Sequence, residues 1–144
     1  MSRPNTSVIF CGDRAWKGRG VVSDRLVRLL KRDPIIVHGA ARGADEISGL
    51  EATLLGLRVV SFPAEWERYG RGAGPIRNQA MLDQAPNLLG VIAFHDHLNR
   101  SKGTNDMLNR CLAQSIPCVL FGSNGKAFWK FDGTHAEVRK RNRR

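Results

Sequence analysis

Five short apolar runs recur along the chain, and the stretches between them carry apolar residues at helical spacing. The runs cover residues 7–11, 35–38, 58–62, 88–94 and 117–121. Nearly continuous hydrophobicity of this kind is typical of strands that are covered on both faces, as in a parallel sheet. The alternation therefore predicts an α/β fold with a doubly wound, mainly parallel sheet of about five strands and helices on both faces.

Four helices are predicted between these strands. Ser23 is expected to cap the first, Asp45 to begin the second, Pro75 to begin the third, and Thr104 to lie near the start of the fourth. The apolar face of the second helix is expected to consist of Ile47, Leu50, Leu54 and Leu57.

The apolar pattern fades after residue 121, which sets the predicted domain organisation. Residues 126–132 read as either a short strand or an ordered tail. We expect one α/β domain over residues 1–125 and a basic C-terminal tail over residues 126–144. A chain of 144 residues and 16.0 kDa has room for a single core.

Basic residues are concentrated at the C-terminal end. The net charge is +10, and residues 126–144 carry half of it, since seven Lys and Arg residues there face two acidic ones. A basic tail is either a solvated arm or a source of nonspecific attraction to nucleic acid, and charge alone does not separate the two.

Several classes of protein are disfavoured by composition. No apolar run approaches the roughly 20 residues that cross a bilayer, and the polar start lacks a signal-peptide core. Cys11, Cys111 and Cys118 are an odd number without metal-binding spacing, so we expect reduced core residues of a cytoplasmic protein. The run from His95 to His97 lacks a third spaced ligand, and neither a metal nor a cofactor is expected.

Four polar or glycine-rich segments follow the predicted strands, at residues 12–16, 39–45, 66–78 and 101–106. In a parallel sheet, the loops that follow the strands emerge at one edge, where ligands of such folds bind. Because the four segments share this edge, we expect them to form one ligand-binding crevice.

The residue types in these segments favour an anionic ligand. Arg77 supplies a planar donor fork, and Asn78 a donor and an acceptor, from the start of a helix whose free amides attract negative charge. Gly39 and Gly43 permit close approach of the backbone to a ligand. Neither a dinucleotide fingerprint nor a Walker A loop is present, so a nicotinamide cofactor and nucleoside triphosphate hydrolysis are not indicated.

Aromatic and acidic residues in the same segments have two interpretations each. Trp16, Trp66 and Tyr69 either stack on a base or pack against the domain. Asp45 either caps its helix or bonds a ribose hydroxyl or a base. The predicted ligand-binding residues are Gly12, Arg14, Trp16, Gly39, Ala40, Arg42, Gly43, Asp45, Trp66, Arg77, Asn78, Ser101, Lys102, Gly103 and Thr104.

Five short motifs stand at the expected edge of the sheet: Cys-Gly-Asp-Arg at 11–14, Val-His-Gly-Ala-Ala-Arg-Gly-Ala-Asp at 37–45, Phe-Pro-Ala-Glu-Trp at 62–66, Gly-Ala-Gly-Pro-Ile-Arg-Asn at 72–78 and Ser-Lys-Gly-Thr at 101–104. Together they resemble the SLOG superfamily, which is named for the Smf/DprA DNA-processing proteins and the Lonely Guy phosphoribohydrolases. The pattern is most like that of its small YspA-like members from bacteria and bacteriophages. This resemblance implies a Rossmann-like fold with a pocket for a nucleotide or nucleotide-derived ligand, at or near a homodimer interface.

The resemblance has one departure that concerns catalysis. Lonely Guy enzymes cleave a base from a nucleoside monophosphate with the motif Pro-Gly-Gly-x-Gly-Thr-x-x-Glu, whose Glu does the chemistry. Aligned on Gly103-Thr104, this chain has Asn-Arg-Ser at 99–101 and Met107 at the Glu position. Asp106 is one residue early, which turns its carboxylate by about 100° on a helix.

Arg77 matches the arginine that those enzymes use at the start of a helix, so the resemblance implies that the binding half of the site is retained. The leading expectation is a module that binds a nucleotide or nucleotide-derived ligand, as a sensor, a sponge or part of a larger system. The alternative is a nucleosidase or phosphoribohydrolase that uses Asp106 or Asp45 as its acid/base group. A third reading is DprA-like binding of single-stranded DNA, suggested by the net charge.

Overall fold

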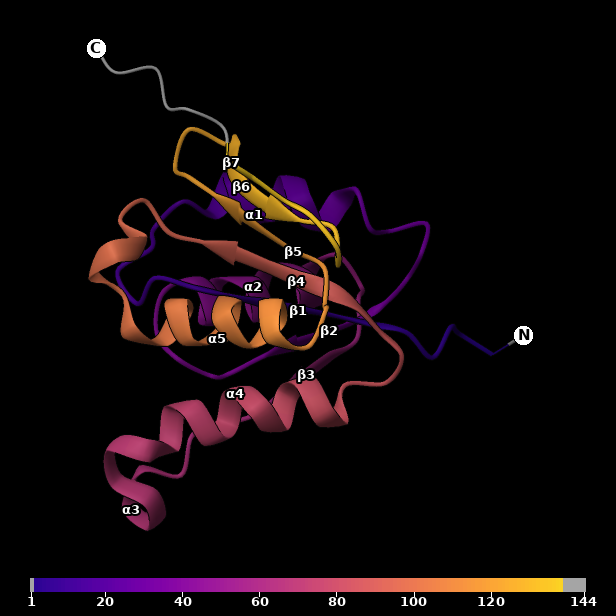
Figure 1. The fold of residues 1–144 in the computed structure, drawn as a ribbon. Helices are drawn as coiled ribbons and strands as arrows, with labels where there is room; N and C mark the ends of the chain where they lie inside the picture. Colours follow the sequence, from indigo (N-terminus) through magenta and orange to yellow (C-terminus); the bar gives the residue numbers. More distant parts are fainter. Residues whose placement is uncertain (1, 139–144) are drawn as a thin grey trace.

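The computed structural model describes residues 2–138, which form a seven-stranded sheet in the order β3-β2-β1-β4-β5-β6-β7 (Figure 1). The first five strands of the chain are parallel, and the last two are antiparallel to their neighbours. The strands are β1 (Ser7–Gly12), β2 (Ile35–His38), β3 (Val59–Ser61), β4 (Leu88–Phe94), β5 (Cys118–Phe121), β6 (Ala127–Phe131) and β7 (Ala136–Val138).

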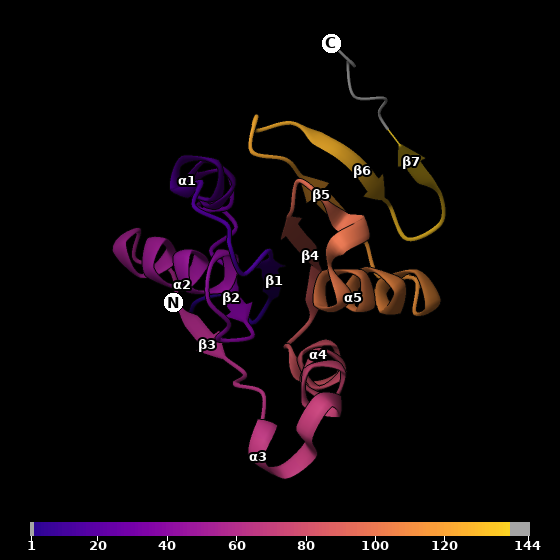
Figure 2. The same ribbon diagram turned by 90° about the vertical axis from the view of Figure 1, so that its left-hand side faces the viewer.

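Helices cover both faces of the sheet. α1 and α2 lie on one face, and α4 and α5 lie on the other (Figure 2). The predicted α/β class with a mainly parallel sheet is therefore confirmed. The helical elements are α1 (Arg19–Val27), α2 (Ala44–Leu54), α3 (Trp66–Tyr69), the 3-10 turn η1 (Gly70–Gly72), α4 (Ala73–Gln84), the 3-10 turn η2 (Leu98–Arg100) and α5 (Lys102–Ala113).

Two helix predictions on the first face were wrong, the second of them only in part. Ser23 lies inside α1, which begins at Arg19, so it caps nothing. In the predicted apolar face of the second helix, Leu50 and Leu54 are 57% and 75% exposed, whereas Ile47 packs against the core and Leu57 is buried. The residues that α2 buries are smaller: Ala44, Asp45, Ser48 and Ala52. α2 packs on β1 and β2, and small side chains at such a contact let a helix lie close to a sheet.

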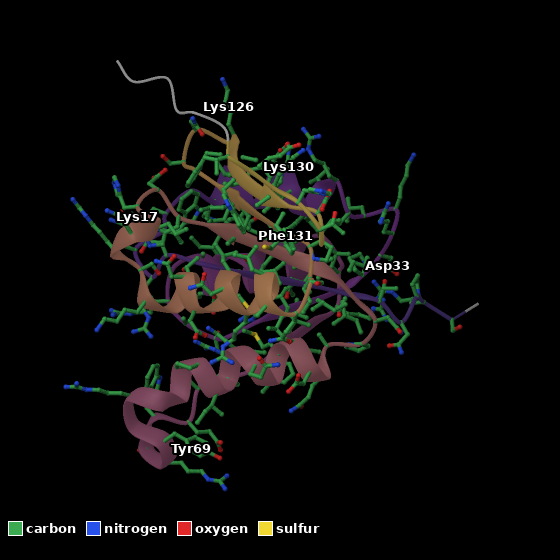
Figure 3. The ribbon with its side chains drawn as sticks, in the orientation of Figure 1. Lys17, Asp33, Tyr69, Lys126, Lys130 and Phe131 are labelled. Atoms are coloured by element: carbon green, nitrogen blue, oxygen red, sulfur yellow. The ribbon has the colours of Figure 1, made fainter. Side chains whose placement is uncertain are left out.

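The chain continues the sheet after β5. The strand interpretation of residues 126–132 is confirmed by β6, whose Phe131 is buried against the core, whereas β7 was not anticipated. Lys130, labelled in Figure 3, lies in β6, and Lys126 directly precedes this strand. Residues 127–131 and 136–138 are therefore part of the sheet, and residues 139–144 of the predicted basic tail lie outside the described residues.

The order of the strands places a switch point at β1. The chain runs from β1 outward to β2 and β3, then returns to add β4 and β5 on the other side of β1. At the carboxyl ends of β1 and β4 the two directions of winding leave a crevice, where ligands of such sheets bind. No helix of the described chain is both long and apolar enough to cross a membrane.

Candidate functional site

All four predicted segments reach one cleft at the carboxyl edge of the sheet. The cleft has a volume of about 710 Å³. A smaller cavity of about 310 Å³ adjoins it, and the two share Arg14, Ala41, Trp66 and Arg77 as lining. Of the predicted residues, the large cleft is lined by Gly12, Arg14, Asp45, Trp66, Arg77, Asn78, Ser101, Lys102, Gly103, Thr104 and Asp106, and the small cavity by Arg14, Gly39, Ala40, Arg42, Trp66 and Arg77.

Two of the predicted residues do not line either cavity. Trp16 is 6% exposed because its ring packs on Phe94 in the core, and its Nε1 donates to the Gly18 carbonyl at 3.0 Å. The stacking role proposed for Trp16 is therefore corrected to core packing. Gly43 has a φ of +73°, and a Cβ there would collide with the backbone of Asp13 and Arg14, so its role is to let two turns touch.

The turn from β2 to α2 differs from the expected phosphate cradle because its amides already have partners. The Asp45 carboxylate accepts from the amides of Gly39 at 3.0 Å and Ala41 at 3.2 Å. The Ala40 amide donates to His38 Nδ1 at 3.0 Å, and the Ala44 amide to the Asp13 carbonyl at 3.0 Å. This turn therefore offers a ligand its side chains, above all that of Arg42, rather than these amides.

Segment 66–78, expected as a long loop, is helical almost throughout. α3 and η1 lead directly into α4, which begins two residues before Pro75. The Ala73 amide donates to the Gly70 carbonyl, so the start of α4 is not the free helix terminus that was predicted. α3 projects from the body of the protein and carries Tyr69 away from the sheet (Figure 3). Neither cavity is lined by Tyr69.

Arg77 and Asn78 lie in the second turn of α4. Their hydrogen bonds connect segment 66–78 with segments 39–45 and 101–106. The Arg77 guanidinium donates to the Gly39 carbonyl through Nη1 and to Asn78 Oδ1 through Nε at 3.0 Å. A Cβ at position 39 would lie 2.7 Å from Cζ of Arg77 and 2.9 Å from Asp45 Oδ2, so a larger residue would displace these two side chains. Asn78 is 4% exposed and donates to the Gly103 carbonyl at 3.2 Å.

The start of α5 is the segment that keeps the expected geometry. Ser101 caps the helix, with its Oγ accepting from the Thr104 amide at 3.0 Å, so the cap is Ser101 and not Thr104. The amides of Lys102 and Gly103 belong to the first turn, where helix N–H groups have no partner within the helix. This helix end therefore suits an anion in the large cleft.

Burial raises the pKa of Asp45 to about 6, against the lowering effects of the Ala41 amide, Arg77 and the Gly39 amide. The carboxyl is 4% exposed, and taking a charged form out of water costs free energy. Between the ordinary pKa of 3.8 and the folded value of about 6, the folded protein binds more protons than the unfolded chain. Asp45 therefore destabilises the fold progressively as the pH rises through this window.

Asp45→Asn is expected to remove this pH dependence, because an amide oxygen accepts the same two backbone hydrogen bonds without a charge. Relative to the wild type, the variant should gain about 2–3 kcal/mol of unfolding free energy between pH 4 and pH 7.5. Urea unfolding of both proteins over this range measures the difference. Stability curves that stay parallel from pH 4 to pH 7.5 would contradict a raised pKa for Asp45.

His95 and Asp13 form a pair at the switch point that the sequence prediction missed. His95 is 6% exposed and lines the large cleft; its Nδ1 accepts from the His97 amide at 2.9 Å. The neutral ring therefore carries its proton on Nε2, which lies 3.9 Å from Asp13 Oδ2. Burial lowers the pKa of His95. The pair was detectable in principle, since each residue directly follows a strand.

Six cations line the two cavities. Within residues 2–138, none of the six forms an ion pair with a carboxylate. Arg14 lies with its Cζ 5.5 Å from the centre of the Trp66 ring, which is 48% exposed. The cations are Arg14, Arg42, Arg71, Arg77, Arg100 and Lys102.

Comparison with known proteins shows the family of this chain. A family model described as "YspA, cpYpsA-related SLOG family" matches residues 6–69. The Gene 61 protein of Mycobacterium phage D29 is 36% identical over 125 residues, covering 80% of this chain and 95% of that protein. The chain belongs to the YspA, cpYpsA-related SLOG family. No solved structure matches it.

The match to the SLOG family model covers β1 to α3, and so contains the turns that carry Arg14 and Arg42. The position of the Lonely Guy glutamate is occupied by Met107, which is 1% exposed in the core. Asp106 Oδ2 accepts from Asn78 Nδ2 at 3.0 Å and from Arg110 Nε at 2.9 Å. This SLOG chain thus has a carboxylate one residue before the expected position, and hydrogen bonds from Asn78 and Arg110 hold it in place.

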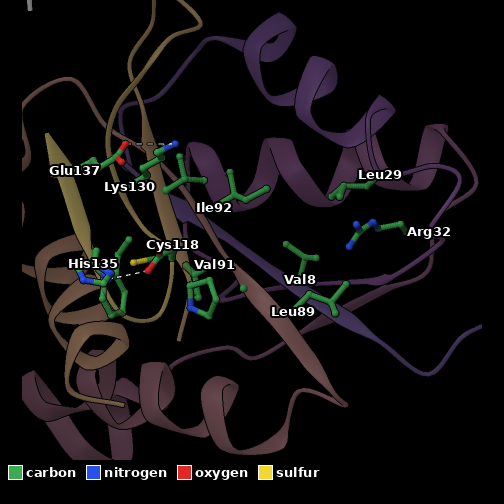
Figure 4. Close-up of a pocket in the computed structure, with 15 residues that line it drawn as sticks. Val8, Leu29, Arg32, Leu89, Val91, Ile92, Cys118, Lys130, His135 and Glu137 are labelled. Atoms are coloured by element: carbon green, nitrogen blue, oxygen red, sulfur yellow. Dashed lines mark hydrogen bonds and ion pairs between the residues drawn. The ribbon is translucent and has the colours of Figure 1, made fainter. Parts of the chain in front are cut away.

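A third hollow, of about 370 Å³, lies away from this site (Figure 4). Its lining is mostly apolar and includes Val8, Leu29 and Val91, and no residue of the four segments lies there. Lys130 and Glu137, which both line the hollow and lie at one side in Figure 4, form an ion pair of 3.5 Å in which their charges cancel. An anion therefore has much less to bind in this hollow than in the large cleft of the SLOG site.

Proposed function

We propose that this SLOG-family protein binds a nucleotide or nucleotide-derived ligand in the two adjoining cavities, as a sensor, a sponge or the ligand-binding part of a larger system. The observation that carries the proposal is the set of six cations that surround the cavities and form no ion pair with a carboxylate of the described residues. Concave sites lined by one sign of charge concentrate ligands of the opposite sign. Family membership supports the same class of ligand.

The remaining lining suits the other parts of a nucleotide. The half-exposed Trp66 ring, with Arg14 beside it, offers a flat surface on which a base stacks. Asp13 and Asp106 supply carboxylate oxygens that accept hydrogen bonds from ribose hydroxyls. Phosphate, base and sugar thus each have a complementary group in the lining.

The test is a titration of the purified protein, by calorimetry, with the four nucleoside 5′-monophosphates, the four nucleosides and the four 5′-phosphorylated homodinucleotides. At least one phosphorylated probe is expected to bind about tenfold or more tightly than its nucleoside, because charge-assisted hydrogen bonds to phosphate are worth about 1.5–3 kcal/mol. Binding of a nucleoside as tight as that of its phosphorylated forms, or no binding of any phosphorylated probe, would end the proposal.

Two further measurements on the purified protein test the alternative functions: incubation with the nucleoside monophosphates, and titration with a single-stranded oligonucleotide. Release of a free base, lost in Asp106→Ala or Asp45→Ala, would favour the phosphoribohydrolase. Affinity for a single-stranded oligonucleotide that falls steeply with salt would favour nucleic-acid binding. A truncation designed for that test has to begin after Val138, because removing β6 would take the buried Phe131 from the core.

A further inference from the structure

The two cavities differ in the sign of the groups that line them. In the small cavity, the titratable lining residues of the described chain are Arg14, Arg42 and Arg77, and all are cations. The large cleft adds three cations, Arg71, Arg100 and Lys102, but also three carboxylates, Asp13, Asp45 and Asp106. The small cavity is therefore purely cationic, and the large cleft has mixed charge.

The two cavities share a boundary, called the wall below, which consists of residues that line both of them. Arg14, Trp66 and Arg77 line both of them, and the Arg14 guanidinium lies beside the Trp66 ring. Arg77 is fixed in this wall by its hydrogen bonds to Gly39 and Asn78. A ligand that crosses the wall passes an aromatic face, which a base or ribose contacts well, and has cations at both ends.

A single phosphate leaves part of this charge unmatched. Placed in the small cavity, it pairs with Arg42 but leaves Arg100 and Lys102 without an anion; placed in the large cleft, it leaves Arg42 unpaired. Cavities that hold drug-sized ligands have about 300–1,000 Å³. At about 310 and 710 Å³, each of the two has room for a separate part of one ligand.

We propose that the ligand carries two phosphate groups separated by a nucleoside, as in a 5′-phosphorylated dinucleotide. The terminal phosphate, which carries nearly two negative charges, occupies the small cavity with Arg42. The phosphodiester, which carries one, occupies the large cleft near Lys102, where carboxylates accept from ribose hydroxyls. This inference rests on the proposed function and specifies the class of ligand for the same site.

Three probes of one base separate the proposal from simple charge attraction: the 5′-phosphorylated dinucleotide (pNpN), the same dinucleotide without its terminal phosphate (NpN), and the nucleoside 5′-diphosphate. The base is the one that binds most tightly in the titration above. The diphosphate has nearly the same charge as pNpN, but its phosphates are adjacent. We expect pNpN to bind about tenfold or more tightly than either of the other two.

Two variants assign the phosphates to the cavities. Arg42→Ala is expected to weaken pNpN about tenfold and NpN less than twofold, because NpN lacks the phosphate that Arg42 binds. Lys102→Ala should weaken both dinucleotides by a similar factor. The control is Arg28→Ala, which removes an exposed cation directly after the last residue of α1. It should change the affinity for neither dinucleotide. Circular dichroism of each variant verifies that it is folded.

Two results would overturn the inference. A diphosphate that binds as tightly as pNpN would mean that charge alone, not the separation of the phosphates, determines affinity. An Arg42→Ala effect of equal size on pNpN and NpN would mean that the terminal phosphate lies elsewhere. In both cases nucleotide binding itself would persist, so the proposed function would stand, whereas absence of binding by every phosphorylated probe would remove both.

Discussion

Gly12→Ala is expected to lower the free energy of unfolding by about 3 kcal/mol or more. Gly12 ends β1 with a φ of +151°, which side chains other than glycine rarely adopt. An added Cβ would overlap the Phe94 carbonyl oxygen and would lie 2.8 Å from the Phe94 nitrogen. Both are backbone atoms of the neighbouring strand β4, and neither moves without breaking the pairing at the switch point. Urea unfolding monitored by tryptophan fluorescence measures the change.

Gly20→Ala is the matched control for this substitution. Gly20 lies in the first turn of α1, and an added Cβ would meet nothing within 4 Å. Because alanine is a better helix former, this variant should be unchanged or up to about 1 kcal/mol more stable. Equal stability of the two alanine variants would show that β1 and β4 do not approach each other as closely at Gly12 as described.

Arg77→Ala is expected to weaken binding of the tightest nucleotide probe by about 10- to 100-fold, equivalent to about 1.5–3 kcal/mol. The reason is twofold. The substitution removes a cation that lines both cavities, and it frees the Gly39 turn that the guanidinium holds through its carbonyl. Calorimetric titration at low and at physiological salt measures the loss, and Arg28→Ala serves as the control.

Arg77→Lys separates charge from geometry. A lysine keeps the positive charge but not the planar fork that bonds Gly39 and Asn78 at once. We expect its affinity to lie between those of the wild type and Arg77→Ala. An Arg77→Ala variant with unchanged affinity would place the phosphate away from the wall that divides the cavities, and would contradict the site as proposed.

The sequence predicted the strands well because burial on both faces leaves a simple signal. β2 and β4 coincide with the apolar runs at residues 35–38 and 88–94, and β5 differs by one residue from the run at 117–121. For the helix that follows β2, only half of the predicted buried face is correct: Ile47 and Leu57 pack in the core, whereas Leu50 and Leu54 are exposed. Its leucines repeat at helical spacing, but the spacing does not reveal that mainly small side chains are buried where α2 approaches the sheet.

The candidate site divides in a similar way. The four segments were predicted from their positions after strands, since parallel topology brings such positions to one edge. The partners of their backbone amides were not predictable, because the Asp45 carboxylate and the Asp13 carbonyl reach the β2–α2 turn only in the folded chain. The positions of His95 and Asp13 directly after strands were visible in the sequence, but the 3.9 Å distance between their side chains follows only from the fold, and the pair was missed.

What the sequence by itself determined is the α/β class, the parallel strands and the edge at which the polar segments gather, since these follow from local hydrophobic patterns and the direction of parallel strands. Only the tertiary structure decided which groups remain free to meet a ligand. Arg77 lies in the wall between two cavities, Trp16 lies in the core, and Arg42 has no carboxylate partner among residues 2–138. Such outcomes depend on distances between residues far apart in the chain, and periodicity contains no information about those distances.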